Sequence, residues 1–145
     1  MVLSKIGYTD YMKKDIITKE IIKHIARDIS THILNIKVAD EIILIDKEFT
    51  RVEKRESDIV FINGDEQIVH IEIQNNNHNK MHLRMHRYIS VILFEYPDYS
   101  ISQYLLYIGK EKCSMKNSIT KEKLLYSYAI IEDRKSTRLN SSHRL

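Results

Sequence analysis

Alternating hydrophobic and polar residues predict a β-hairpin in the middle of the chain, between residues 56 and 74. Two runs rich in Ile, Val and Phe, Asp58–Ile62 and Gln67–Ile73, flank a turn that begins at Asn63-Gly64. An Asn-Gly pair tolerates the positive φ angles that a tight turn requires. The two runs therefore predict antiparallel partners joined by a short loop.

The second strand of this hairpin has one apolar and one polar face. Alternation places Val69, Ile71 and Ile73 on one face and His70, Glu72 and Gln74 on the other. The register decides whether Asp58 joins the polar face. A three-residue loop at 64–66 pairs Asn63 with Gln67 and sets Asp58 opposite Glu72, whereas a two-residue Asn-Gly loop separates the two acids. We predict the odd loop, or a bulge at Gly64 that restores the shared face.

Helical periodicity precedes the hairpin. From Asp15 onward, isoleucines recur at steps of three and four residues, which predicts an amphipathic helix. The members of this stripe are Ile17, Ile21, Ile22, Ile25, Ile29, Ile33 and Leu34. A short, continuous apolar run at Glu41–Ile45 then predicts a buried strand, which Phe49–Val52 extends.

A second helix and further strands follow the hairpin. A polar turn at 75–78 opens a helix that runs to about Tyr96, because Pro97 stops it. The run Ser102–Gly109 predicts a fourth strand, Glu111–Thr120 a polar loop and Leu124–Ile131 a last strand. The predicted fold is an α/β domain, a mixed four- or five-stranded sheet around a central hairpin with helices on its faces.

Two carboxylates on adjoining strands make an oxygen-rich site for a hard divalent cation. Asp58 and Glu72 suit Mg²⁺, which keeps several waters and also takes oxygens from a phosphate substrate. The alternative is an exposed hairpin whose acids are solvated, because acids are common at strand edges.

The order of these residues resembles the PD-(D/E)XK nuclease superfamily. Asp58, the hairpin and the triplet Glu72-Ile73-Gln74 match its metal-binding core, and the ExQ form resembles the branch of recombination-promoting nucleases and putative transposases, the Rpn family. The following helix carries the spacing M-x-x-R-x-x-x-Y at Met81, Arg84 and Tyr88. The resemblance covers roughly residues 16–131 and is clearest over 57–109. It implies a restriction-endonuclease-like core.

The resemblance also implies roles for particular residues. Asp58 and Glu72 would bind the metal, and Gln74 would orient the attacking water. Gln74 stands where the wider superfamily has a Lys, and an amide supplies neither positive charge nor a titratable proton. Arg84 and Lys80 on the second helix would then meet the charge on the phosphate.

Three other side chains enter as candidates. His70 shares a face with Glu72 and would contact substrate at the rim of the site. Glu20 on the first helix is a candidate accessory acid, since many superfamily members carry a Glu there; the alternative is a solvated helix face. His78, His82 and His86 have the four-residue spacing of a zinc-binding helix, but no Cys or acid completes the set, which favours structural or solvated histidines.

Composition narrows the class of protein. The chain has 145 residues, 43% of them hydrophobic and 30% charged, which is typical of one globular domain. No apolar run reaches the ~20 residues that span a bilayer. The single Cys113 cannot form an internal disulfide, as expected in a reducing cytoplasm, and it is expected in a loop or at an edge.

The formal net charge of +3 arises at the C-terminus. Residues 134–145 hold Arg134, Lys135, Arg138 and Arg144 and no acid, so without them 19 basic residues face 20 acidic ones. This Ser- and Arg-rich tail resembles translated vector sequence. We therefore expect a nuclease-like domain at residues 1–133, truncated at its C-terminus, and a foreign or disordered tail at 134–145.

The sequence thus predicts a cytoplasmic, Mg²⁺-dependent DNA endonuclease associated with recombination, with a homodimer as a candidate assembly. A catalytically inactive nucleic-acid-binding or protein-interaction module on the same fold is the alternative. A third reading is an inactive fragment that lacks part of its core.

Overall fold

A computed structural model describes residues 18–45 and 58–132 of the chain. A first helix covers residues 18–28 and continues without a break into η1 (Ile29–Ile33), a π-helical turn. The other elements, in order, are β1 (Ile42–Leu44), β2 (Asp58–Asn63), β3 (Gln67–Gln74), α2 (Met81–Glu95), β4 (Ser100–Tyr107), β5 (Ser118–Lys121), β6 (Leu124–Ser127) and β7 (Ala129–Glu132).

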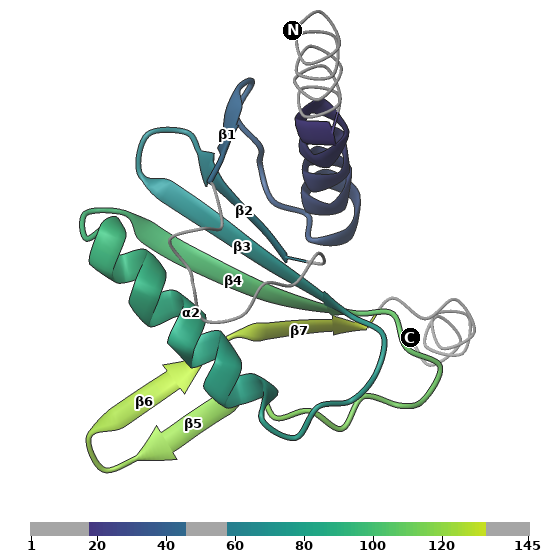
Figure 1. Cartoon of the computed structure of the whole chain (residues 1–145), viewed down its shortest axis with the longest axis vertical. Coiled ribbons are helices and arrows are strands. Elements are labelled where there is room, and N and C mark those ends of the chain that lie inside the picture. Colours follow the sequence, from purple (N-terminus) through teal and green to yellow (C-terminus); the bar gives the residue numbers. More distant parts are fainter. Residues whose placement is uncertain (1–17, 46–57, 133–145) are drawn as a thin grey trace, which may run out of the picture.

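Five of the strands form one mixed sheet in the order β1-β2-β3-β4-β7 (Figure 1). β1, β2 and β3 pair antiparallel, whereas β4 runs parallel to both β3 and β7. Parallel neighbours need a crossover, and α2 provides it between β3 and β4. β5 and β6 form a separate hairpin. The prediction of an α/β fold with a mixed sheet of four or five strands is confirmed, with five strands in the sheet.

The central hairpin has the predicted odd register. Residues 64–66 form a three-residue loop, and Asn63 pairs with Gln67. Gly64 has a φ of +72°, a backbone conformation that residues other than Gly and Asn rarely adopt. Asp58 consequently lies directly opposite Glu72, with both side chains on the same face of the sheet.

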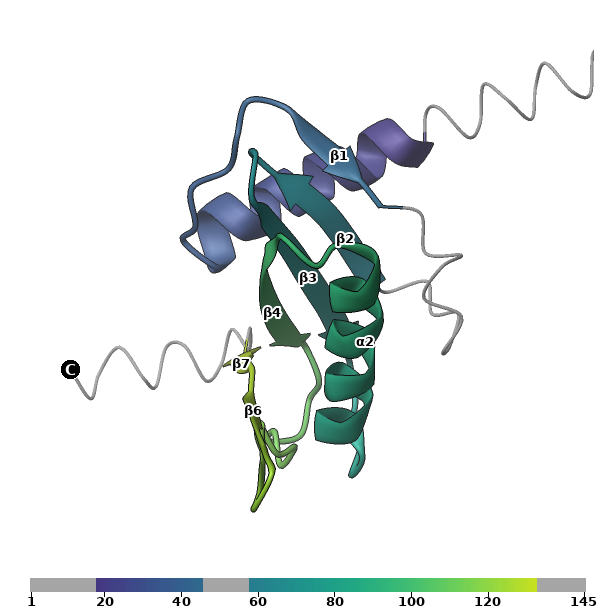
Figure 2. The same cartoon turned by 90° about the vertical axis from the view of Figure 1, so that its left-hand side faces the viewer.

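Helices cover the two faces of the sheet, the first helix on one side and α2 on the other (Figures 1 and 2). The face under the first helix is apolar: Ala26 and Ile29 of that helix join one core cluster with Phe61, Val69 and Ile71 of the hairpin. Ile22, Ile33 and Leu34 also pack against this cluster, but Ile21 and Ile25 are 52% and 43% exposed, so only part of the predicted stripe is buried.

The face under α2 has a different composition. One apolar cluster gathers around Met81, Met85 and Leu105, and another around Ile68 and Ile92. Buried polar residues lie between them. We call this set the polar band; it consists of Asp58, His70, Glu72, Gln74, Arg84 and Gln103.

Two predictions about strands are wrong. The run 124–131 forms two strands, β6 and β7, and Ser118–Lys121 is a strand within the predicted loop. Lys121 pairs with Leu124, so the turn consists of Glu122 and Lys123, which carry none of the Gly, Pro or Asn signals of a turn. In β1, Ile43 is 61% exposed because an edge strand of this sheet buries only one of its faces.

Several predicted features lie outside the described residues: the start of the first helix at residues 15–17, the extension Phe49–Val52 and the tail at 134–145. Cys113 lies in a loop, as expected, and is half-buried. Within the described ranges, neither helix has a stretch long and apolar enough to cross a membrane.

Candidate metal centre

Two neighbouring strands bring the candidate metal ligands together. Asp58 opens β2, and Glu72 lies opposite it near the end of β3. His70 lies two residues before Glu72 and so shares its face. Asp58 is 4% exposed and the other two are fully buried. Each of the three offers one ligand atom, and these atoms all lie within 4.8 Å of one another.

The surroundings of Glu72 explain how a carboxylate is held in the interior. Its Oε1 accepts a hydrogen bond of 2.9 Å from Gln74 Nε2 and lies 3.8 Å from Arg84 Nη1. Its Oε2 lies 3.7 Å from His70 Nε2 and accepts no hydrogen bond from any residue in ranges 18–45 and 58–132. A buried carboxylate oxygen without a donor costs free energy. A divalent cation beside Asp58 and Glu72 would satisfy it, so the two carboxylates fit a hard metal ion.

Gln74 lies at the centre, where it contacts the carboxylate of Glu72. Its amide nitrogen donates to Glu72, which fixes the orientation of that carboxylate. Its carbonyl oxygen is the atom through which it can accept a hydrogen bond from water. In this arrangement the main contact of Gln74 is with Glu72, whose carboxylate it holds in one orientation.

Arg84 reaches the same centre from α2. It is 5% exposed, with Nη1 near Glu72 and Nη2 3.3 Å from His78 Nε2. The buried guanidinium thus balances part of the carboxylate charge. Lys80 is exposed at the N-cap of α2, one turn before Arg84, and it lies toward solvent on the same side of the helix.

The predicted position of His70 at the rim is wrong. His70 is fully buried, because α2 covers this part of β3. The Tyr88 ring packs against the imidazole with 5.0 Å between ring centroids. His70 therefore belongs to the interior of the centre and has no surface from which to contact a substrate directly.

Two residues behind His70 were not among the predicted site residues. Gln103 on β4 pairs with His70 in the parallel register and places Nε2 3.1 Å from His70 Nδ1. Tyr126 of β6 donates its hydroxyl to Gln103 Oε1. Burial raises the pKa of Tyr126 above its usual range, and neighbouring Tyr128 raises it further, so Tyr126 keeps this proton. The one available signal was a Gln directly before the apolar run Tyr104–Ile108.

The structure does not bring Glu20 to this centre. Glu20 is exposed, and its carboxylate lies 3.7 Å from Lys23 Nζ. It lines a surface cleft that Ile42 of β1 also lines. Ile42 pairs with Asn63, at the opposite end of β2 from Asp58, which is about 16 Å away at ~3.3 Å per residue. Glu20 is thus too distant to act as an accessory acid here.

The three spaced histidines do not form a metal site with one another. His78 precedes α2 and contacts Arg84, whereas His86 packs edge-to-face on Tyr126. Among the described residues, the group of potential ligands is Asp58, His70 and Glu72. The structural interpretation of His78, His82 and His86 is the one that fits.

Searches against models of protein families, curated proteins and solved structures find no match to this chain. The functional argument therefore depends on the geometry of the polar band.

Proposed function

We propose that this protein is a divalent-cation-dependent nuclease that hydrolyses phosphodiester bonds in DNA, of the kind associated with recombination. The observation that carries the proposal is the pairing of Asp58 with Glu72, which gathers two buried carboxylates on one face of a hairpin. The order of Asp58, Glu72 and Gln74 along this hairpin, and its resemblance to the PD-(D/E)XK core, supports the same reaction.

Asp58 and Glu72 would hold the cation, preferably Mg²⁺. When bound, such an ion lowers the pKa of a coordinated water and stabilises the charge that develops on the scissile phosphate. Gln74 holds Glu72 through its amide nitrogen, and its carbonyl oxygen would orient the water. Arg84 lies beside Glu72 and would place a positive charge next to the phosphate. Lys80, exposed at the start of α2, would contact the DNA backbone.

The test is nicking of supercoiled plasmid DNA with Mg²⁺, with and without a chelator. Asp58→Asn and Glu72→Gln each keep the side-chain volume and remove one ligand charge. We expect each to lower the rate at least about a hundredfold, because a metal ion supplies several kcal/mol of transition-state stabilisation.

The hairpin also provides matched controls for these variants. Asp65 and Glu66 lie exposed in its loop, so Asp65→Asn and Glu66→Gln make the same chemical changes outside the polar band. Both controls should cleave at the wild-type rate. Wild-type nicking that survives chelation, or an Asp58→Asn variant as active as Asp65→Asn, would refute the proposal.

A second candidate is a nucleic-acid-binding module without catalysis. Two observations favour it: Gln74 brings no positive charge, and Arg84 is already engaged with Glu72. This candidate predicts DNA retention in a gel-shift assay that Asp58→Asn leaves unchanged, together with no nicking by the wild type at any Mg²⁺ concentration.

A further inference from the structure

The amide of Gln103 is held in one orientation. Its Nε2 lies 2.9 Å from the backbone carbonyl oxygen of Met85, and a carbonyl oxygen only accepts hydrogen bonds. The atom that faces Met85 is therefore the NH₂ group. On the other side of the amide, the hydroxyl of Tyr126 donates to Oε1. Rotating the amide by 180° would set two oxygens against each other at Met85.

The same NH₂ group determines the state of His70. Gln103 Nε2 carries two hydrogens, one for Met85 and one for His70 Nδ1 at 3.1 Å. Nδ1 must then present a lone pair, so the ring proton of neutral imidazole lies on Nε2. An imidazolium would point a second N–H at this NH₂ group, and that contact opposes the attraction of the Asp58 and Glu72 carboxylates for a positive charge.

The proton-bearing nitrogen faces the carboxylates. His70 Nε2 lies 3.7 Å from Glu72 Oε2, too far for a direct hydrogen bond. The ring cannot easily turn away, because Tyr88 packs against it and both side chains are almost fully buried. His70 thus presents a donor, held from behind by Gln103, toward the carboxylate of Glu72.

We propose that Gln103 holds His70 as the Nε2–H tautomer, so that the imidazole is a hydrogen-bond donor to the centre and not a metal ligand. The consequence for the metal, which rests on the proposed function, is a site made of carboxylate oxygens. A histidine that binds a metal normally donates its other N–H to a carboxylate or carbonyl. Gln103 supplies a donor there instead. The centre then selects hard ions such as Mg²⁺ and gives Zn²⁺ no nitrogen ligand.

The first experiment needs no metal. In metal-free protein labelled with ¹⁵N-histidine, the shifts of the two ring nitrogens and their couplings to ring protons show which nitrogen carries hydrogen. The signal of His70 is the one missing in His70→Asn. We expect a protonated Nε2 and a bare Nδ1 at neutral pH. A protonated Nδ1, whether in the other tautomer or in an imidazolium, would overturn the assignment.

The second experiment replaces the hydrogen-bond donor beside His70 Nδ1 with an acceptor. Gln103→Glu sets a carboxylate oxygen against the carbonyl oxygen of Met85, which loses its donor, and places an acceptor behind His70 Nδ1. In the folded variant this acceptor should move the ring proton to Nδ1 and leave Nε2 free to bind a metal. We expect the Zn²⁺ affinity relative to Mg²⁺, measured by calorimetry, to rise about tenfold or more, the scale on which such outer partners act. Gln67→Glu is the matched control, because Gln67 lies three residues before His70 in β3, so its side chain is on the opposite face, where it donates a hydrogen bond to Ser102.

The outcomes separate the two proposals. If Gln103→Glu folds and His70 keeps the wild-type tautomer, the proposed role of Gln103 is contradicted. X-ray absorption that shows a nitrogen ligand on Zn²⁺ bound to the wild type would contradict it as well. If Gln103→Glu does not fold, the wild-type spectrum still decides the tautomer. If the wild type binds no divalent cation, the proposed nuclease function fails while the tautomer assignment is decided separately by the spectrum.

Discussion

Both faces of the sheet carry buried side chains, and they differ in which kinds of residue they bury. Under the first helix, residues such as Phe61 and Ile71 pack into one apolar cluster. Under α2, the polar band separates two apolar clusters, and its groups depend on one another for partners. Polar groups in a dry interior cost free energy unless they are bonded. The comparison indicates that one face stabilises the fold while the other uses part of that stability to hold a cluster of buried polar and charged side chains.

The largest effect on stability should come from the apolar face. Phe61 is fully buried, and Phe61→Ala should lower the free energy of unfolding by about 3–5 kcal/mol, because it removes buried area and leaves a cavity. The measurement is urea unfolding followed by circular dichroism.

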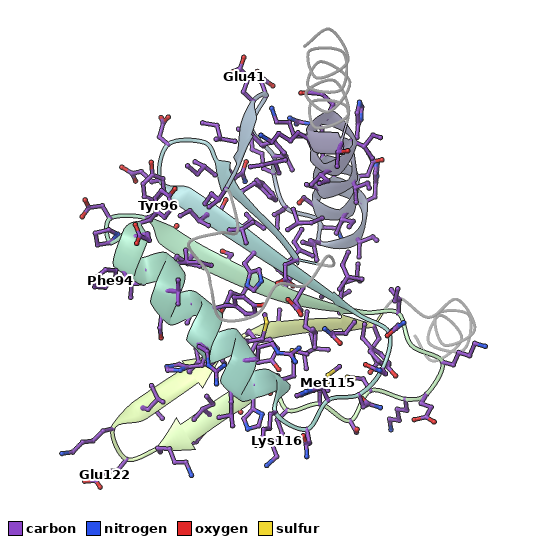
Figure 3. The ribbon with its side chains drawn as sticks, in the orientation of Figure 1. Glu41, Phe94, Tyr96, Met115, Lys116 and Glu122 are labelled. Atoms are coloured by element: carbon purple, nitrogen blue, oxygen red, sulfur yellow. The ribbon has the colours of Figure 1, made fainter. Side chains whose placement is uncertain are left out.

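Phe94 is the matched control for that substitution. It is 84% exposed on α2 and points away from the sheet (Figure 3), so Phe94→Ala should change stability by less than about 0.5 kcal/mol. Equal losses in the two variants would contradict the division between a packed face and the outer surface of α2.

The second largest effect on stability should come from removing the Arg84 charge from the polar band. Arg84→Met leaves Glu72 in the interior without its guanidinium, and breaking a buried pair in this way costs about 3 kcal/mol. Adding Glu72→Gln removes the orphaned charge and should restore at least about 1 kcal/mol of that loss. Urea unfolding of the two single variants and the double variant measures this coupling. Strictly additive losses would show that the two residues do not depend on each other.

A smaller effect should appear at alkaline pH, where Tyr128 in the cluster around Met81 titrates. Burial, with a contribution from nearby Cys113, raises the pKa of Tyr128 from 10.0 to about 12. The folded protein then binds more protons than the unfolded chain between these values, so stability is complete below pH 10 and falls as the pH rises toward 12.

The midpoint of urea unfolding, followed from pH 8 to 11.5, tests this expectation. Tyr128→Phe removes one titrating group and should make the decline shallower, while Tyr126, whose pKa burial also raises, continues to contribute. A decline of the same steepness in that variant would assign the effect to other groups.

The smallest effect belongs to the edge of the sheet. Ile43 is exposed on β1, and Ile43→Thr keeps a β-branched side chain, so stability should change by less than about 0.5 kcal/mol. Thermal unfolding is sufficient to check it. A loss above about 1 kcal/mol would mean that the side chain is covered in solution.

The hairpin was predictable because its information is local. Asn63-Gly64 marks the turn, and alternation in β3 determines which residues share a face, so only the loop length remained open between Asp58 and Glu72. The second helix was also predictable, because its apolar residues follow helical spacing and Pro97 ends it. These residues are Met81, Met85, Tyr88 and Ile92.

What the sequence could not specify depends on contacts between distant segments. The pairing of Gln103 with His70 follows from the parallel register of β3 and β4. Because α2 lies between these strands in the sequence, no local pattern specifies that register. The burial of His70 follows from the position of α2 over the sheet. The hairpin of β5 and β6 was missed because its turn, Glu122-Lys123, has no residue that favours a turn.

The most direct test of the central claim is a cation titration followed by thermal unfolding of the wild type, Asp58→Asn and Asp65→Asn. If Asp58 and Glu72 share one cation, Mg²⁺ at 100-fold above its dissociation constant should stabilise the wild type and Asp65→Asn by about 2.7 kcal/mol. Asp58→Asn should gain almost nothing. A wild type that Mg²⁺ does not stabilise, or an Asp58→Asn variant stabilised as much as Asp65→Asn, would contradict a metal centre at these two carboxylates.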